Sequence, residues 1–319
     1  MKIFVTGTAG FIGSHLAHSL LDDGHEVVGL DNFSDYYDVS LKEARSARLE
    51  GRKGYTGIKG DLTDYESLIS NFKFHEPQLV CHLAAQAGVR YSITHPFAYQ
   101  KANLEGHLNI LEACRHAKIQ RLVYASSSSV YGGNKKVPFS ESDPVDSPIS
   151  LYAATKKADE LMSYTYTHLY GLQTVGLRFF TVYGPWGRPD MAYWTFTEAM
   201  LKGAAIPVFN YGKMERDFTY ITDIVTGVKA ALFADGLDPY EIFNLGNNRA
   251  ENLMDFIKTL ADALGVEPKM EMLPMQPGDV PVTFADISKA RKKLGYEPST
   301  PISKGLPEFV KWYKEYFNR

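Results

Sequence analysis

Short runs of β-branched and aliphatic residues alternate with longer amphipathic segments through the first 180 residues of the chain. Near-continuous apolar strands separated by helices are typical of a parallel sheet covered on both faces. Because crossover connections are right-handed, this order predicts an α/β fold with a doubly wound parallel sheet. The predicted strands are Lys2–Thr6, Glu26–Leu30, Gln78–Leu83, Arg121–Ala125 and Gln173–Phe180, and the predicted helices are Phe11–Asp23, Asp64–Phe74, Ala98–Ala117 and Leu151–Tyr170.

Three glycines at three-residue spacing follow the first predicted strand and open the next helix. Gly7 permits the tight turn, Gly10 lets the backbone approach a pyrophosphate, and Gly13 allows close packing of helix on strand. The free N–H groups at the helix start, around Phe11 and Ile12, attract phosphate together with the helix dipole. A strand before the turn and a helix after it are the context that this motif requires, so it predicts a Rossmann-type dinucleotide-binding unit.

The acid at the end of the second predicted strand indicates which dinucleotide is bound. Asp31 can accept hydrogen bonds from the adenosine ribose hydroxyls and repels a 2′-phosphate. Asn32 and the two residues after it offer no arginine for such a phosphate, so NAD is favoured over NADP. Asp61 and Leu62, just past a third strand, are expected to approach the adenine. On spacing alone, Asp61 could equally be an acid at the start of the next helix.

Beyond residue 180 the pattern is less regular, because Pro185, Pro189 and Pro207 interrupt it. We expect residues 1–180 to form the NAD-binding domain and residues 181–319 to form mainly a smaller α/β lobe that binds substrate. A strand and helix from about 215–248 are expected to join the main sheet. The elements predicted in this part are the helices Asp223–Ala234, Leu253–Leu264, Ile287–Leu294 and Ile302–Tyr316, and a strand at Glu241–Leu245.

Composition limits the partners of the chain. A net charge of −3 over 319 residues gives no indication of nucleic acid or of an anionic membrane as a partner. Cys81 and Cys114 both lie in apolar periodic stretches, so we interpret them as buried reduced thiols and expect no metal site. No apolar run approaches the length of a membrane helix, and no signal-peptide pattern is visible. A cytoplasmic location is therefore expected.

A tyrosine and a lysine stand four residues apart at the start of the predicted helix Leu151–Tyr170. Tyr152 and Lys156 therefore share one helical face. An ammonium nearby favours a phenolate, which makes Tyr152 a candidate general base for a hydroxyl that is oxidised. The strand before this helix ends in the serines 126–129, at the carboxyl edge where parallel sheets bind ligands.

Together, the glycine turn, the serines before Val130-Tyr131-Gly132 and the Tyr152/Lys156 pair resemble the extended short-chain dehydrogenase/reductases. Within these, the chain is similar almost end to end to NAD-dependent nucleotide-sugar epimerases and dehydratases. The resemblance implies that Ser127 hydrogen-bonds the reacting hydroxyl, Tyr152 transfers its proton and Lys156 holds the nicotinamide ribose. Other matching segments are His82-Leu83-Ala84-Ala85, Asn103 with Gly106 and Asn109, and Arg216–Ile221. They imply cofactor contacts for Leu83, Ala84, Ala85 and Asn103, and a contact of Arg216 with the sugar-nucleotide diphosphate. An ion pair of Arg216 with Glu215 or Asp217 is the alternative.

The resemblance also bears on the reaction. Enzymes of this family begin alike: the tyrosine takes the proton of the sugar C4 hydroxyl while hydride passes from C4 to NAD. The dehydratases have an Asp-Glu pair after the active-site Thr, and UDP-glucuronate decarboxylases have a Glu just before the Val-Tyr-Gly. Here those positions are Ser128 and Ser129. Without a carboxylate there, we expect hydride to return to a rotated 4-keto sugar, which is epimerisation.

Residues 86–92 and 181–191 closely resemble UDP-glucuronate 4-epimerases. UDP-galactose 4-epimerases commonly have Asn where this chain has Thr181 and Arg where it has Gln276, three residues before Asp279. The hydroxyl of Thr181, with those of Ser127 and Ser128, can donate hydrogen bonds to a C6 carboxylate. The predicted substrate-binding set is completed by Arg90, Arg188, Arg216, Gln276 and Asp279. Arg188 and Arg90 are equally open to a structural role in their loops.

The leading hypothesis is NAD-dependent C4 epimerisation of UDP-glucuronate to UDP-galacturonate. Alternatives within the enzyme class are a UDP-glucose/galactose or UDP-N-acetylhexosamine 4-epimerase and a UDP-glucuronate decarboxylase. A non-catalytic NAD-binding regulator is the alternative from another class. The helices Ala98–Ala117 and Leu151–Tyr170 carry apolar side chains on more than one face, and relatives pair these helices into a four-helix bundle. A homodimer is therefore expected, with burial under the C-terminal lobe as the alternative.

Overall fold

A seven-stranded sheet forms the centre of the molecule, in which every pair of neighbouring strands is parallel. The structure, a computed structural model, describes residues 1–275 and 281–318. The strand order is β11-β6-β5-β4-β1-β2-β3. The bounds are β1 Lys2–Thr6, β2 Glu26–Asp31, β3 Tyr55–Lys59, β4 Leu79–His82, β5 Arg121–Ser127, β6 Gln173–Phe179 and β11 Tyr240–Leu245. The predicted fold class, a Rossmann-type doubly wound α/β fold, is confirmed.

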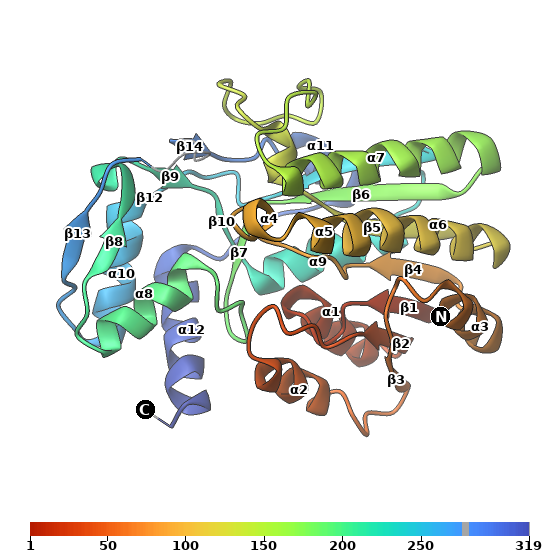
Figure 1. Cartoon of the computed structure of the whole chain (residues 1–319), viewed down its shortest axis with the longest axis horizontal. Helices are drawn as coiled ribbons and strands as arrows, with labels where there is room; N and C mark the ends of the chain where they lie inside the picture. The colour runs from red at the N-terminus through yellow and green to blue at the C-terminus, as the bar shows by residue number, and fades with distance from the viewer. Residues whose placement is uncertain (276–280, 319) are drawn as a thin grey trace.

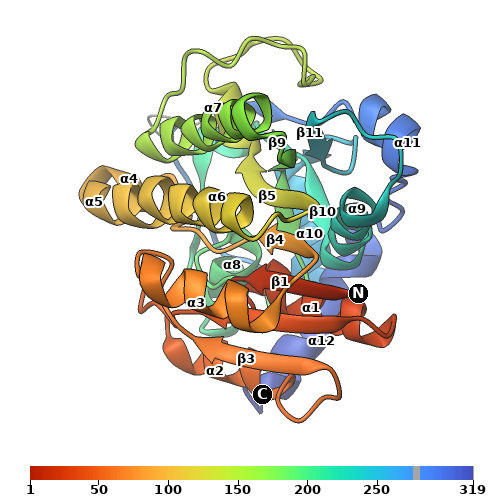
Figure 2. The ribbon, with the colours of Figure 1, turned by 90° about the vertical axis from the view of Figure 1, so that its right-hand side faces the viewer.

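Helices cover both faces of this sheet (Figure 2). On one face lie α1 (Phe11–Asp22) and α9 (Ile221–Phe233), and on the other lie α3 (Tyr65–His75), α6 (Gly106–His116) and α7 (Leu151–Tyr170). Successive residues of β1 serve different cores: Ile3 and Val5 pack under α1, whereas Phe4 packs under α3 and α6. Side chains in a strand point alternately to opposite faces, so a strand covered on both faces must be apolar throughout.

A smaller lobe with its own apolar core lies beside the sheet, at the left of Figure 1. It is built from α8 (Ala192–Leu201), α10 (Leu253–Leu264), α12 (Ile302–Tyr316), β8 (Ile206–Val208) and β13 (Met270–Met272). Short strands lie between the lobe and the sheet: β7 Thr181–Tyr183, β9 Glu215–Arg216, β10 Phe218–Tyr220, β12 Glu251–Asn252 and β14 Val282–Thr283. The remaining elements are α2 Val39–Ala47, α4 Tyr91–Thr94, α5 Pro96–Tyr99, η1 Gln100–Glu105, η2 Ser128–Tyr131, η3 Phe209–Gly212 and α11 Ser288–Leu294.

Three departures from the predicted elements concern the site. The predicted helix Ala98–Ala117 is interrupted by a π-helical turn, η1, which contains Asn103. Helix α2 was not predicted, because its buried face includes Lys42 and Arg45 beside a single leucine. Helix α8 was not predicted either, since the prolines around it suggested irregular structure and its sequence is apolar on most sides. Cys81 and Cys114 are free and buried, as predicted.

Candidate active site

One cavity of about 970 Å³ brings together most of the predicted site residues. Its volume is at the upper end of the range for ligand pockets, about 300–1,000 Å³. The cavity lies at the carboxyl ends of the sheet strands, where open α/β sheets bind ligands, and α8 and β8 line its other side. The predicted residues that line it are Gly7, Gly10, Phe11, Ile12, Gly13, Asp31, Asn32, Asp61, Leu62, Leu83, Ala84, Ala85, Arg90, Ser127, Ser128, Tyr152, Lys156, Thr181, Arg188 and Arg216. Asn103 does not line it, and Gln276 and Asp279 lie outside the described residues.

The glycine turn between β1 and α1 is shaped by close backbone contacts. Gly7 has a φ of +80°, a conformation that side chains disfavour. A Cβ at Gly13 would lie 2.0 Å from the carbonyl oxygen of Gly7, so the helix packs directly on the turn. No side chain in the described part of the chain caps α1 at its N-terminus. Its first N–H groups therefore remain for a ligand, as the pyrophosphate of a dinucleotide requires.

The carboxylate of Asp31 is fixed at the end of β2. It is 8% exposed, and its two oxygens accept hydrogen bonds from the backbone N–H groups of Ala9 (2.9 Å) and Phe33 (2.8 Å). Each oxygen keeps a further lone pair for a ribose hydroxyl. These contacts tie the glycine turn to the acid that was predicted to select the ribose, so this end of the cavity fits the adenosine half of NAD.

Asp61 and Lys42 also line this end of the cavity. Asp61 accepts a hydrogen bond from the amide of Asn32 (2.9 Å), whereas Asp64 caps α3. The structure thus gives the helix-capping role to Asp64 and leaves Asp61 at the cavity wall. Lys42, which sequence reasoning missed, also lines the cavity. Burial lowers the pKa of Lys42, and the charge of Asp31 opposes that shift.

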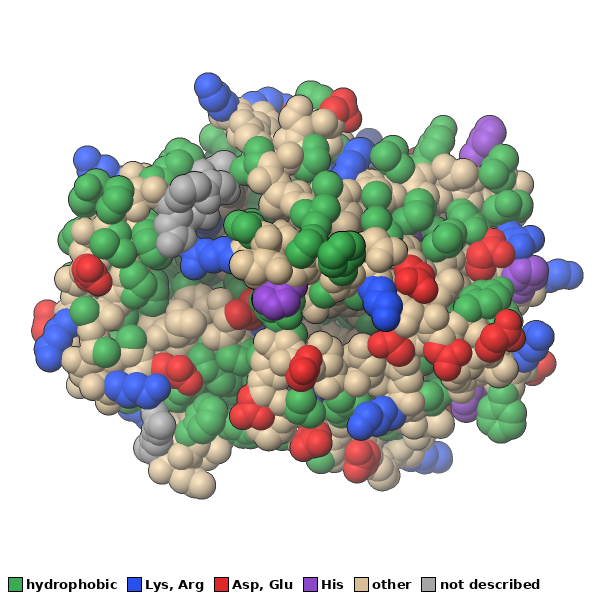
Figure 3. Space-filling view, in the orientation of Figure 1, with side chains coloured by type: hydrophobic (Ala, Val, Ile, Leu, Met, Phe, Trp, Pro, Cys, Tyr) green, Lys and Arg blue, Asp and Glu red, His purple; other side chains and the backbone are tan. Residues whose placement is uncertain are grey.

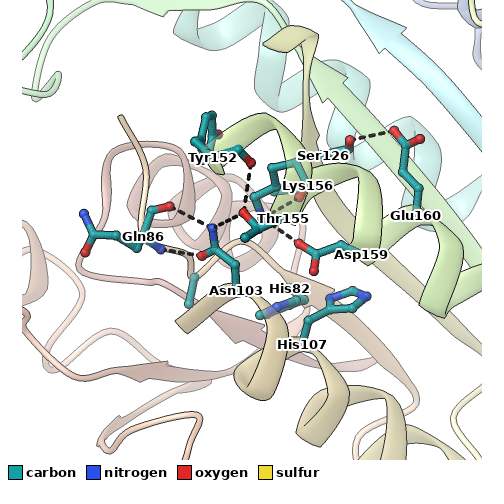
Figure 4. Close-up of polar contacts among 12 residues, drawn as sticks. His82, Gln86, Asn103, His107, Ser126, Tyr152, Thr155, Lys156, Asp159 and Glu160 are labelled. Atoms are coloured by element: carbon teal, nitrogen blue, oxygen red, sulfur yellow. Dashed lines mark hydrogen bonds and ion pairs between the residues drawn. The ribbon is translucent and has the colours of Figure 1, made fainter. Parts of the chain in front are cut away.

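The candidate catalytic residues come from β5 and α7, which lie side by side (Figure 4). Ser150 caps α7 by accepting a hydrogen bond from the N–H of Ala153 (3.1 Å), which fixes where the helix begins. One turn after Tyr152, the Lys156 ammonium donates to the Ala125 carbonyl (3.1 Å) and to Asp159 (3.0 Å). Ser127 ends β5, and its hydroxyl accepts a hydrogen bond from the Ser129 N–H (3.1 Å). A hydroxyl, a phenol and an ammonium therefore line one cavity, which is the equipment for moving a proton to and from an alcohol.

Asn103 supports the cavity wall from behind. It is 1% exposed; its amide oxygen accepts from the Gln86 N–H (2.8 Å), and its amide nitrogen donates to the Gln86 carbonyl (3.1 Å) and to the Thr155 hydroxyl (3.0 Å; Figure 4). The π-helical turn η1 carries this side chain. Asn103 therefore links the loop after β4, which lines the cavity, to the helix of Tyr152.

The remaining predicted substrate residues lie across the cavity from the glycine turn. Thr181 begins β7, and its N–H donates to the Asp217 carbonyl (3.2 Å). Arg188 forms a two-point ion pair with Asp190, which also accepts from the Tyr36 hydroxyl (3.0 Å). Burial raises the pKa of Asp190, but the charge and hydrogen bonds of Arg188 outweigh burial and the pKa is lowered. Arg188 thus organises its loop while its side chain reaches the cavity.

Two arginines predicted to contact substrate also make contacts within the protein. Arg216 donates to the carbonyls of Glu215 (2.9 Å) and Pro281 (3.0 Å) and lines the cavity. The guanidinium of Arg90 lies 5.7 Å from the centre of the Phe209 ring, and both residues line the cavity.

A buried arginine that sequence reasoning missed joins the two halves of the site. Arg45 of α2 is fully buried and donates to the Ala9 carbonyl in the glycine turn (3.2 Å). It also donates to the carbonyls of Trp186 (2.7 Å) and Gly187 (2.6 Å), just before Arg188. The helical spacing of Leu41 and Arg45 was the available signal, but an arginine at an apolar position obscured it.

No helix in the part of the chain that the structure describes is long and apolar enough to cross a membrane. Among residues 1–275 and 281–318, no cluster of three or more His, Cys, Asp or Glu side chains could hold a metal ion.

Residues 3–246 match the NAD dependent epimerase/dehydratase family, and the chain belongs to this family. It is 50% identical to UDP-glucuronate 4-epimerase 4 of Arabidopsis thaliana over 334 residues, which cover 100% of this chain and 76% of that protein. A solved structure of UDP-glucuronic acid 4-epimerase from Bacillus cereus, in complex with UDP-glucuronic acid and NAD, superposes with a TM-score of 0.92. It is 35% identical, with 99% of this chain and 100% of that chain covered.

UDP-glucose 4-epimerase of Thermotoga maritima, solved with UDP-glucose, matches with a TM-score of 0.88 and 32% identity, covering 99% of this chain and 100% of that chain. Within the family, the chain is thus related to NAD-dependent UDP-sugar 4-epimerases. The predicted enzyme class and the predicted cofactor, NAD, are confirmed.

Proposed function

We propose that this protein is a UDP-glucuronate 4-epimerase, which interconverts UDP-glucuronate and UDP-galacturonate. One observation carries the choice of reaction and sugar. Ser127, Ser128 and Thr181 line the cavity that holds Tyr152 and Lys156, and the two positions after Ser127 carry hydroxyls instead of carboxylates. Hydroxyl groups suit a C6 carboxylate as hydrogen-bond donors, and they cannot serve as the acid and base of an elimination.

NAD, when bound, supplies a reversible hydride acceptor for C4 of the sugar. The glycine turn holds its pyrophosphate, Asp31 its adenosine ribose and Lys156 its nicotinamide ribose. Ser127 binds the C4 hydroxyl, and Tyr152 accepts its proton. After the 4-keto sugar has rotated to present its opposite face for the return of hydride, Tyr152 returns the proton to the C4 oxygen. Arg216 binds the diphosphate of the nucleotide sugar. In this division, residues 1–180 hold the cofactor and residues 181–319 mainly hold the nucleotide sugar.

A UDP-glucuronate epimerase must protect its 4-keto sugar. That compound is a β-keto acid, and it loses CO₂ when the bond to the carboxylate aligns with the ketone π system. Hydrogen bonds from Ser128 and Thr181 can hold the carboxylate out of this alignment. The ion pair of Arg188 with Asp190 keeps the neighbouring loop in place during that step.

Product analysis tests the assignment. Purified protein with NAD is incubated separately with UDP-glucuronate, UDP-glucose and UDP-N-acetylglucosamine, and the sugar anomeric signals are followed by NMR. We expect UDP-galacturonate from the first substrate, and much slower or no epimerisation of the other two. Release of CO₂ with accumulation of UDP-xylose would identify the protein as a UDP-glucuronate decarboxylase. Conversion of only the uncharged sugars would identify it as a UDP-glucose/galactose or UDP-N-acetylhexosamine 4-epimerase.

We also propose that two copies pair through α6 and α7. Apolar side chains remain exposed along these helices, in the region where Figure 3 shows hydrophobic surface: Leu108 is 41% exposed, Leu161 57%, Tyr164 54% and Leu169 60%. These positions lie on the side away from the sheet, so the C-terminal lobe does not cover them. Several large apolar side chains exposed on neighbouring helices are typical of a subunit interface.

Replacement of one apolar side chain tests this interface. Leu161→Glu would place a charge in the proposed contact, and we expect the variant to sediment as a monomer at concentrations where the wild type sediments as a dimer. Phe74→Glu is the control, because Phe74 is 81% exposed but lies on α3. A monomeric wild type, or a dimer that Leu161→Glu leaves intact, would exclude this surface.

A further inference from the structure

A buried carboxylate lies directly below the candidate catalytic pair (Figure 4). Tyr152, Lys156, Asp159 and Ser163 follow one another along α7 at spacings of three or four residues, so they share one face of the helix. Asp159 is 1% exposed and Lys156 3%. A face packed on a sheet is normally apolar, so an acid at this position requires an explanation.

Asp159 holds Lys156 from the side away from the cavity. The ammonium has three N–H donors; one bonds Ala125 and one bonds Asp159, both within the protein. Lys156 lines the cavity whereas Asp159 does not. Two fixed hydrogen bonds behind the ammonium therefore leave its third N–H for the cavity, where the proposed function needs a donor to the cofactor ribose.

Glu160, the next residue on the same helix, is a buried carboxylate whose two oxygens both have hydrogen-bond partners. One oxygen of Glu160 accepts from the Ser126 hydroxyl (2.7 Å) and from Arg178 (2.8 Å), and the other accepts from Arg178 (2.9 Å). By contrast, the Oδ1 oxygen of Asp159 has no hydrogen-bond partner among the described residues. Asp159 is thus buried with half of its hydrogen-bonding capacity unused, which is costly for a carboxylate.

Ionisation of Asp159 at neutral pH lowers the stability of the fold, because burial disfavours the charged carboxylate. Burial raises its pKa to about 6, although the charge of Lys156 opposes the shift. Because the folded-state pKa is raised, this group stabilises the fold when it is protonated, and that contribution is lost as the pH rises through about 6. Stability therefore does not account for an ionised Asp159.

We propose that Asp159 is a positioning residue of the epimerisation reaction, which anchors the Lys156 ammonium and keeps one of its N–H groups directed at the cofactor. The inference rests on the proposed function, because it assigns Lys156 the ribose contact. When Asp159 takes up a proton, Lys156 loses its anchor and its counter-ion. Turnover and cofactor retention then decline together as the pH falls through about 6.

The other titratable groups around Asp159 do not titrate in that range. His82 of β4 has its pKa lowered to about 3 by burial and by the charge of Lys156, and burial lowers the pKa of His107 of α6 well below its ordinary value. Hydrogen bonds and charge from Arg178 lower the pKa of Glu160 against its burial. Burial also raises the pKa of Asp217 to about 6, but its carboxylate accepts hydrogen bonds from Thr219, Asn247 and Ala285 and bonds neither Asp159 nor Lys156.

The experiment compares Asp159→Asn with the wild type between about pH 5 and pH 8. It measures kcat and KM with UDP-glucuronate, and separately the rate at which NAD leaves the enzyme during gel filtration. At neutral pH we expect kcat to fall about 10- to 100-fold with KM little changed, because the lysine is misplaced while the sugar contacts persist. The variant is expected to lose the decline below pH 6. It should release NAD faster than the wild type above about pH 6, and the two release rates should converge below it.

Glu241→Gln is the matched control. Glu241 is also a buried acid paired with lysines, Lys289 and Lys293, but it lies near the start of β11, away from the carboxyl ends of the strands. We expect its kinetics to follow the wild type. Asp159→Asn kinetics within about twofold of the wild type, or an unchanged acid limb in that variant, would overturn the proposal. The proposal would also be overturned if wild-type kcat did not decline below about pH 6. That measurement does not depend on folding of the variant. If no UDP-sugar is epimerised, the proposed function fails, whereas the rate of NAD release still tests Asp159.

Discussion

Tyr152→Phe is expected to abolish epimerisation while leaving the folded, NAD-containing protein intact. A positioned general acid or base contributes about 10²- to 10⁴-fold to a rate, and kcat is expected to fall by that factor. The phenol oxygen makes no hydrogen bond to any residue that the structure describes, so its removal leaves no buried group without a partner. The measurement is kcat by coupled assay or NMR, with the dissociation constant of UDP-glucuronate determined by calorimetry. That constant should change little.

The same variant separates the enzyme from a non-catalytic NAD-binding regulator. Tyr164→Phe makes the same chemical change three turns further along α7, where the side chain is 54% exposed and far from the cavity. It should turn over like the wild type. If Tyr152→Phe kept more than about a tenth of wild-type kcat, Tyr152 would not be the proton-transfer group. A regulator would keep its output in both variants.

The sheet and its helices could be predicted because local pattern and global fold agree there. Val80 and Cys81 of β4 pack into different cores, so consecutive residues of the strand are apolar and it stands out in the sequence. Helices α7, α10 and α12 have the bounds that their apolar spacing predicts. Part of the cavity lining followed from the same logic, since the ends of parallel strands meet at one edge, whereas Arg188 and Arg216 were predicted from the family resemblance.

The contacts that hold the site together could not be predicted in this way. Arg45 and Lys42 are buried charges at positions where a helix pattern calls for apolar residues, and they concealed α2. Asp190 pairs with Arg188 two residues away, but it also accepts a hydrogen bond from Tyr36, which is 154 positions away and which no local pattern reports. Asn103 was predicted to contact cofactor from a family motif, whereas in the structure it bonds the loop after β4 and α7. Sequence patterns identify which residues face a ligand more readily than which residues hold them.

In the proposed reaction the same carbon is oxidised and then reduced, so the enzyme has no net need for fresh NAD and benefits from keeping one molecule bound. The glycine turn, which is proposed to hold the pyrophosphate, has no room for a larger residue at position 13. A Cβ at residue 13 would meet three backbone atoms: the Gly7 oxygen at 2.0 Å, the Gly7 carbonyl carbon at 2.7 Å and the Thr8 nitrogen at 3.2 Å. Backbone cannot rotate away as a side chain can, so a single methyl group must separate α1 from the turn.

Gly13→Ala is therefore expected to yield protein without NAD, whereas the wild type should retain NAD through dialysis. The displaced helix no longer aims its N–H groups at the pyrophosphate, and overpacking of this kind costs about 1–3 kcal/mol of stability. The ratio of absorbance at 260 and 280 nm reports bound NAD, and thermal unfolding reports the cost. Gly133→Ala is the control, because among the described residues a Cβ there meets only Ile149, at 3.9 Å. If Gly13→Ala retained NAD and melted with the wild type, close packing at this glycine would not be what holds the cofactor.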